Sequence, residues 1–134
     1  MNENTIICTE KIKFKIEYPD NEIEYISTEN DYFHLMIQIK SGMFSGASEF
    51  CISKGNIIKI IKTLKNMHET LKGSCVISDF DSDGHITIEM QKLGHICISG
   101  QMGGTHQDHY MTFKFMTDQS ILPNLIKNLK KAIS

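Results

Sequence analysis

Three aspartates, Asp79, Asp81 and Asp83, alternate along one short segment, as the first ligands of a calcium-binding loop do. Gly84 follows them and would allow the sharp turn that such a loop needs. The twelfth position, however, is Met90, where the loop requires a bidentate acid, and the flanking segments alternate like strands. The pattern therefore excludes an EF-hand. It favours a plain turn, with weak binding of a hard cation as the alternative.

Two histidines, His106 and His109, lie three residues apart with Asp108 between them. Two imidazoles and a carboxylate could in principle bind a metal ion. In an extended segment, however, a spacing of three points the two rings to opposite faces, and the glycines before this segment disfavour a helix. A polar hairpin loop is favoured, with weak metal binding as the alternative. We expect no cofactor.

Nucleophilic and nucleotide chemistry has little support in the sequence. Ser45 lies in the segment Gly42–Gly46, which resembles half of a G-x-S-x-G elbow, but the first glycine is one position too distant. No strand-turn-helix pattern surrounds this serine, and neither of the common glycine-rich nucleotide-binding motifs occurs. We therefore expect no enzyme, although residues distant in the chain could still assemble a cryptic catalytic site.

The four cysteines are far apart, and none belongs to a C-x-x-C pair. We expect buried, reduced thiols, because the neighbours are mostly apolar and no secretory context favours disulfides. They are Cys8, Cys51, Cys75 and Cys97. The N-terminal residues contain no basic and no apolar region, and no apolar run approaches the roughly 18 residues of a membrane span. These features predict a cytoplasmic protein.

Hydrophobic periodicity predicts a strand-rich chain with two helices. Strands are expected at 11–18, 22–27, 33–40, in a stretch ending at 50–52, and at 75–79, 85–90, 95–102 and 109–117. A helix is expected over 55–72, with Ser53 as its N-cap and Gly73 as its left-handed C-terminal residue. A second helix follows Asp118 or Ser120. The sequence thus predicts one α+β domain of residues 1–134, with an antiparallel β-sheet of about six to eight strands and two amphipathic α-helices packed on it.

Acidic residues are concentrated in one segment near the N-terminus, although the formal net charge of the chain is only −2. They are Glu17, Asp20, Glu22, Glu24, Glu29 and Asp31, and no lysine separates them. These residues form either a solvated strand edge with its turns or a docking surface for a basic partner. The net negative charge and the lack of arginine argue against nucleic acid as that partner.

A set of weak motifs follows in one order from about Tyr32 to the C-terminus. They are Gly42–Gly46 followed by Phe50, a helix ending Leu64 to Gly73, a hairpin centred on Asp83 and Gly84, Gly94 before a strand, and a closing segment from Phe113 to Ser120 with Leu122. This order resembles the WapI-type immunity family, small bacterial cytoplasmic proteins encoded beside polymorphic contact-dependent toxins. The tryptophan that this family has before the first helix is absent, which leaves the subgroup and the partner open.

The resemblance implies a protein without catalysis that binds and masks a cognate toxin domain, often a nuclease, inside the producing cell. The acidic residues from Glu17 to Asp31 would suit a basic toxin of this kind. Two other classes remain open: a small-molecule or metal-binding sensory module, and a cryptic enzyme. No membrane partner is expected, and the sequence does not predict the oligomeric state.

Overall fold

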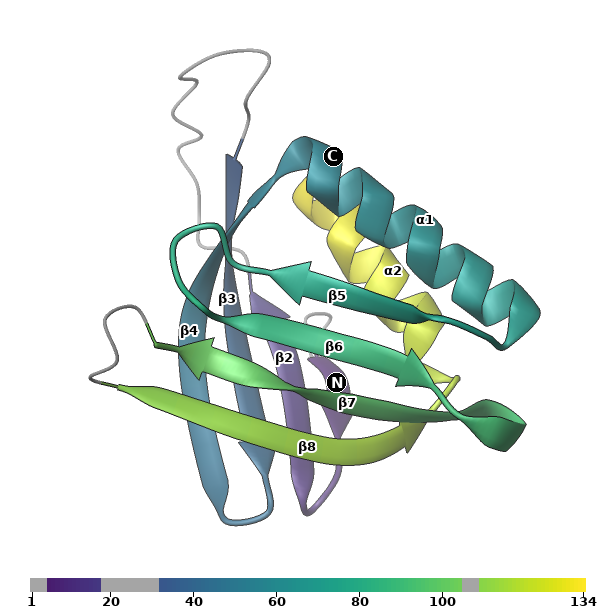
Figure 1. Cartoon of the computed structure of the whole chain (residues 1–134), viewed down its shortest axis with the longest axis horizontal. Helices are drawn as coiled ribbons and strands as arrows, with labels where there is room; N and C mark the ends of the chain where they lie inside the picture. Colours follow the sequence, from purple (N-terminus) through teal and green to yellow (C-terminus); the bar gives the residue numbers. More distant parts are fainter. Residues whose placement is uncertain (1–4, 18–31, 105–108) are drawn as a thin grey trace.

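The structure is a computed structural model that describes residues 5–17, 32–104 and 109–134. Eight strands and two α-helices follow one another in these segments (Figure 1). They are β1 (Thr5–Cys8), β2 (Ile12–Glu17), β3 (Tyr32–Ser41), β4 (Phe44–Ser53), α1 (Lys54–Thr70), β5 (Ser74–Ser78), β6 (His85–Met90), β7 (His95–Gly103), β8 (Tyr110–Asp118) and α2 (Ile121–Ala132), with a short 3-10 turn at Lys92–Gly94. The predicted α+β class is confirmed. The strand expected at 22–27 lies outside the described residues.

The strands form two antiparallel sheets instead of one continuous sheet. Sheet A has the order β1-β2-β3-β4, and sheet B has the order β5-β6-β7-β8. Because α1 follows sheet A and α2 follows sheet B, the same order of four strands and one helix occurs twice in the chain. The sequence does not reveal this division, since alternation identifies a strand but not the strand with which it pairs.

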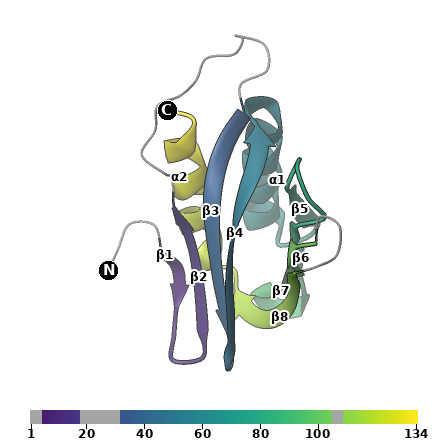
Figure 2. The same ribbon diagram turned by 90° about the vertical axis from the view of Figure 1, so that its left-hand side faces the viewer.

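The two sheets share one hydrophobic core, and their strands cross instead of running side by side (Figure 1 and Figure 2). Phe14 and Leu35 of sheet A and Ile88 of sheet B are completely buried in this core, together with Leu64 of α1 and Leu125 of α2. The helices pack against each other, while α1 also contacts β4 and β5, and α2 contacts β1. The other face of each sheet therefore carries the more exposed residues of the alternation.

Helix α1 begins as predicted and ends differently. The Ser53 hydroxyl oxygen accepts a hydrogen bond from the Asn56 amide at 3.2 Å, which confirms Ser53 as the N-cap. At the other end, Leu71 takes the left-handed conformation with φ 56°, and its amide donates to the Met67 carbonyl at 2.8 Å. The predicted C-terminal residue, Gly73, lies two residues later with φ 103°. The helix therefore ends earlier than the glycine suggested.

Hydrogen bonds fix the start of helix α2 and join this helix to β1. The Asp118 carboxylate accepts a hydrogen bond from the Ser120 amide at 2.8 Å, so of the two predicted capping residues Asp118 supplies the acceptor. The Asn124 side-chain amide donates to the Thr5 carbonyl at 2.8 Å and joins α2 to β1. Neither helix of the described chain is long and apolar enough to cross a membrane.

Candidate functional site

The Asp79 carboxylate holds the β5–β6 turn against sheet A. Asp79 is buried, and its Oδ1 accepts hydrogen bonds from the amides of Cys51 at 2.9 Å and Asp81 at 3.1 Å. Its Oδ2 accepts from the Ser82 hydroxyl at 2.5 Å. The Asp79 amide donates across the turn to the Gly84 carbonyl at 2.9 Å. Because these bonds use both oxygens of a buried carboxylate, the residue acts as a structural acceptor.

The other two aspartates of the calcium-like segment are exposed. The Asp83 carbonyl lies 3.0 Å from Nδ1 of His85. In the described part of the chain, no group of three or more His, Cys, Asp or Glu side chains is arranged to hold a metal ion. Asp79, the first of the three aspartates, is used by hydrogen bonds to the Asp81 amide and the Ser82 hydroxyl within the turn. Of the loop at 103–109, His106 and Asp108 lie outside the described residues, and His109 precedes β8.

The buried cysteines are not activated as nucleophiles. Burial, followed by the nearby carboxylates of Asp81 and Asp79, raises the pKa of Cys51 to about 11. Burial alone raises the pKa of Cys75 to about 11. Both thiols are therefore protonated near neutral pH and react slowly. All four cysteines are free, as predicted. The expectation of burial holds for Cys51 and Cys75 but was wrong for Cys8, which is exposed, and Cys97 is only half-buried.

An aromatic pair is exposed beside this turn. Phe80 is 71% exposed, and its ring centroid lies 5.2 Å from that of Tyr32, the first residue of β3. The Phe80 amide donates to the Cys51 carbonyl at 2.9 Å, which fixes the backbone beneath the ring. A large aromatic side chain on an anchored backbone, with exposed Asp81 and Asp83 in the same turn, is suited to contact a partner protein.

The face of sheet A that points away from the core has an acidic end and a basic end. Glu17 and Glu49 flank Met36 in one row across strands β2, β3 and β4. Nearer the β3–β4 turn, Lys13 lies directly opposite Lys40. Like charges directly opposite each other destabilise a sheet, so this lysine pair has no evident structural purpose.

Glu17 is the one predicted partner-binding residue within the described segments, and it forms an ion pair with Lys15. The others, Asp20, Glu22, Glu24, Glu29 and Asp31, lie outside the described residues. The acidic segment therefore starts at the acidic end of the outer face of sheet A.

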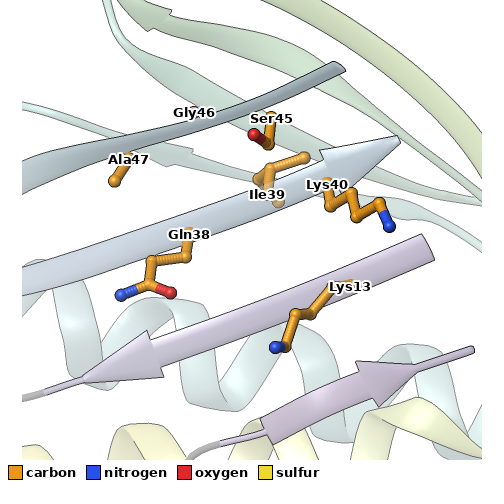
Figure 3. A pocket seen from close by; sticks show the side chains of 7 residues that line it. All are labelled: Lys13, Gln38, Ile39, Lys40, Ser45, Gly46 and Ala47. Atoms are coloured by element: carbon orange, nitrogen blue, oxygen red, sulfur yellow. The ribbon is translucent and has the colours of Figure 1, made fainter. Parts of the chain in front are cut away.

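Two hollows lie on opposite faces of the first half of β4. The larger has a volume of about 390 Å³ and lies on the outer face of sheet A, where Lys13, Gln38, Lys40 and Ser45 project from three neighbouring strands (Figure 3). Its lining residues are Lys13, Gln38, Ile39, Lys40, Ser45, Gly46 and Ala47. The smaller has a volume of about 280 Å³ and is lined by Ser41, Phe44, Met111, Thr112, Phe113 and Lys114. Sequence reasoning found neither hollow.

The turn between β3 and β4 exposes two large apolar side chains. Ser41 pairs with Phe44 across a two-residue turn, and Gly42 takes φ 64° at the first turn position, as a type II′ turn requires. Met43 is 96% exposed and Phe44 is 75% exposed. The turn extends beyond β8 in both views (Figure 1 and Figure 2). Exposed apolar residues of this size are features of binding surfaces, and they were visible in the sequence as two apolar residues at a hairpin turn.

Comparison with known proteins gives the family. Residues 7–134 match the model of the Immunity protein WapI-like family. Because this match spans nearly the whole chain, the protein belongs to that family, and the resemblance seen in the sequence is confirmed. No curated protein matches the sequence.

One solved structure resembles the fold. The crystal structure of WHY3 from Arabidopsis thaliana superposes with a TM-score of 0.47 and 13% sequence identity, over 93% of this chain and 82% of that chain. A likeness at this level supports no argument about function.

Proposed function

We propose that this protein is an immunity protein that binds a cognate bacterial toxin domain in the cytoplasm and neutralises it without catalysis. The observation that carries the proposal is the match of residues 7–134 to the WapI-like immunity family. The protein acts as one domain of 134 residues, and its partner is a protein instead of a nucleic acid or a membrane.

The acidic segment is the proposed electrostatic docking surface of this immunity protein. Six acids from Glu17 to Asp31 carry no compensating lysine between them, and Glu49 adds a seventh acid in the row that Glu17 begins on sheet A. A toxin that acts on nucleic acid needs a basic surface to bind its substrate. The acidic segment would attract and cover such a surface, so a nuclease is the proposed class of toxin.

The test is protection of bacteria from the toxin encoded beside this protein. The toxin domain is induced in cells with the wild-type protein, with an empty vector, or with Phe14→Asp, which places a charge in the completely buried core. Growth with the wild-type protein alone, together with a complex of the two purified proteins, supports the proposal. Toxicity that the wild-type protein leaves unchanged, with no complex in isothermal titration calorimetry, refutes it.

A further inference from the structure

The two sheets have four edge strands, and three of them are protected. β1 is four residues long, and its Thr5 carbonyl is occupied by Asn124 of α2. β5 lies beside α1. β8 carries the exposed Lys114 near its middle. A short strand, a covering helix and an edge lysine are the usual means by which proteins prevent a sheet from adding a further strand.

The fourth edge strand, β4, lacks these protections in its first half. The residues from Ser45 to Ser48 are small and uncharged, and none is proline. Their register with β3 continues without a bulge from the turn to Ser53. A regular, uncharged edge of this kind is open to pairing with another extended segment.

The hydrogen-bonding groups on this edge face outward in a regular series. The Cys51 amide donates to Asp79, and the Cys51 carbonyl accepts from the Phe80 amide, so both groups of Cys51 point away from β3. Because this direction alternates along a strand, the amides and carbonyls of Ser45, Ala47 and Glu49 point the same way. No hydrogen bond to these outward backbone groups is recorded among the described residues. The turn at Asp79 therefore occupies one end of the edge and leaves the other end open.

The two hollows border the place of an added strand. Side chains of an extended segment alternate between the faces of a sheet, so successive residues beside β4 would lie next to Ser45 and Ala47 at the rim of the outer hollow and next to Phe44 at the smaller one. Lys13 and Lys40 line the outer hollow, and neither forms an ion pair with an acid among the described residues. Phe44, Met111 and Phe113 line the smaller one and give it an apolar wall.

We propose that the edge of β4 from Phe44 to Ser48 binds an extended segment of the partner protein, which joins sheet A as a fifth strand. This segment carries acidic side chains on the face of sheet A that holds Lys40 and Lys13, and they alternate with apolar side chains, which cover Phe44 and Met111. That the partner is the toxin rests on the proposed function. The occupant is not β4 of a second copy, because Ser45, Gly46, Ala47 and Ser48 offer side chains too small to fill either hollow.

The first experiment uses a synthetic seven-residue peptide of alternating glutamate and leucine, added to the isotopically labelled full chain and followed by NMR. We expect shifts at the amides of Ser45 and Ala47. A peptide with lysine in place of glutamate should bind at least tenfold more weakly, because its charges would lie on the same face of sheet A as Lys40 and Lys13. Shifts that avoid β4, no binding, or equal binding of the two peptides would overturn the proposal.

Matched variants separate the edge from general effects on the fold. Ala47→Pro removes an outward amide without removing a bond to β3, and we expect tenfold or greater loss of peptide affinity. Val76→Pro is the control, since Val76 is an exposed residue of the other sheet's edge strand β5. Its amide also points outward, because the Asp79 amide three positions later points toward β6, where it donates to Gly84, and the direction alternates along the strand.

A double variant with reversed charges tests the same site if the proline variant does not fold. Lys13→Glu with Lys40→Glu should give the same loss, whereas Lys59→Glu with Lys62→Glu on the exposed face of α1 should not. Equal losses in both pairs would contradict a site at β4.

The same variants are then titrated with the toxin domain. Loss of toxin affinity in Ala47→Pro and in the Lys13 and Lys40 pair, with the controls unchanged, supports the proposal. Undiminished toxin binding by these variants assigns docking to another surface and leaves the proposed function intact. No binding of the toxin by the wild-type protein refutes the proposed function, while the peptide titration still decides the site.

Discussion

The buried Asp79 carboxylate accepts a hydrogen bond from the Cys51 amide, 28 positions earlier in the chain, at 2.9 Å. This bond joins the first turn of sheet B to the last residues of β4 in sheet A. Since the same oxygen also accepts from the Asp81 amide, one side chain fixes both the turn and its contact with sheet A.

Asp79→Ala should lower the free energy of unfolding by about 2–4 kcal/mol, because it leaves the amide of Cys51 without its acceptor in a buried position. Asp79→Asn should cost less, since its amide oxygen can still accept. The matched control is Asp83→Asn in the same turn, where the side chain is exposed and the change should stay within about 0.5 kcal/mol. Urea unfolding followed by circular dichroism gives all three values. An equal cost at Asp79 and Asp83 would contradict the structural role.

Calcium at millimolar concentration should not stabilise the protein. The Asp79 oxygens are already occupied by hydrogen bonds, so the segment cannot offer three free carboxylates without breaking the turn. A site with a dissociation constant of ~10 μM would add about 2.7 kcal/mol at 1 mM calcium and raise the melting temperature visibly. Thermal unfolding with and without calcium measures this. A rise of several degrees that Asp81→Asn with Asp83→Asn abolishes would show that the prediction is wrong.

Two glycines should respond to alanine in opposite directions. A Cβ at Gly100 would overlap with the backbone carbonyl of His85 on the neighbouring strand, so Gly100→Ala should cost about 1–3 kcal/mol. A Cβ at Gly55, near the start of α1, would meet no atom within 4 Å. Gly55→Ala should therefore stabilise by about 0.5–1 kcal/mol through the lower entropy of the unfolded chain. Chemical unfolding compares the two, and stabilisation by Gly100→Ala would contradict the close approach of β6 and β7.

Stability should fall as the pH rises from about 9 to about 11, because burial raises the pKa of Cys75 from 9.0 to about 11. In this window the unfolded chain releases the thiol proton while the folded chain keeps it, so the folded state binds more protons and loses stability with rising pH. The pKa of Cys51 is raised over the same range, so the measurement compares urea midpoints of the wild-type protein and Cys75→Ala. The decline should be smaller in the variant, and parallel curves would exclude a contribution from this thiol.

Parts of the fold that depend on local pattern were predictable from the sequence. Ile12, Phe14 and Ile16 alternate with lysines, and the structure has β2 at that place with the apolar side chains toward the core. Strand β1 was not identified, since Thr5, Ile6 and Ile7 are all buried and show no alternation. In the same way, no local signal distinguishes Asp79, which has a partner 28 residues away, from Asp83, which is exposed.

The candidate site was predictable only in part, because it depends on which strand ends a sheet. Ser45 and Gly46 suggested an incomplete catalytic elbow in the sequence, whereas in the structure they lie on the open edge of β4 between two hollows. The lysines that line the outer hollow come from strands distant in the chain, and their proximity follows from the β2–β3 register. Charge composition alone indicated the acidic segment and gave no sign of this basic end.

The acidic segment should accelerate association with a basic toxin. Long-range attraction acts mainly on the association rate, and salt screens it over a Debye length of ~8 Å at physiological ionic strength. Replacing Glu22, Glu24 and Glu29 by lysine should therefore slow association about tenfold or more at low salt and by less at high salt. Stopped-flow mixing with the toxin domain at two salt concentrations measures both rates.

A second triple variant separates the position of the charges from the net charge. The control variant carries Glu10→Lys, Glu69→Lys and Glu89→Lys, which change the net charge by the same amount. All three residues are exposed, and they lie between β1 and β2, on α1 and on β6. If docking uses the acidic segment, association of this control should slow much less than that of the Glu22, Glu24 and Glu29 variant. The reason is that charges close to the docking surface contribute most to the attraction when the two proteins are near each other. Equal slowing would mean that overall charge steers the toxin without a defined surface. Unchanged rates in both variants would instead assign docking to a neutral or basic surface, and the edge of β4 beside Lys13 and Lys40 would then have to account for the whole association.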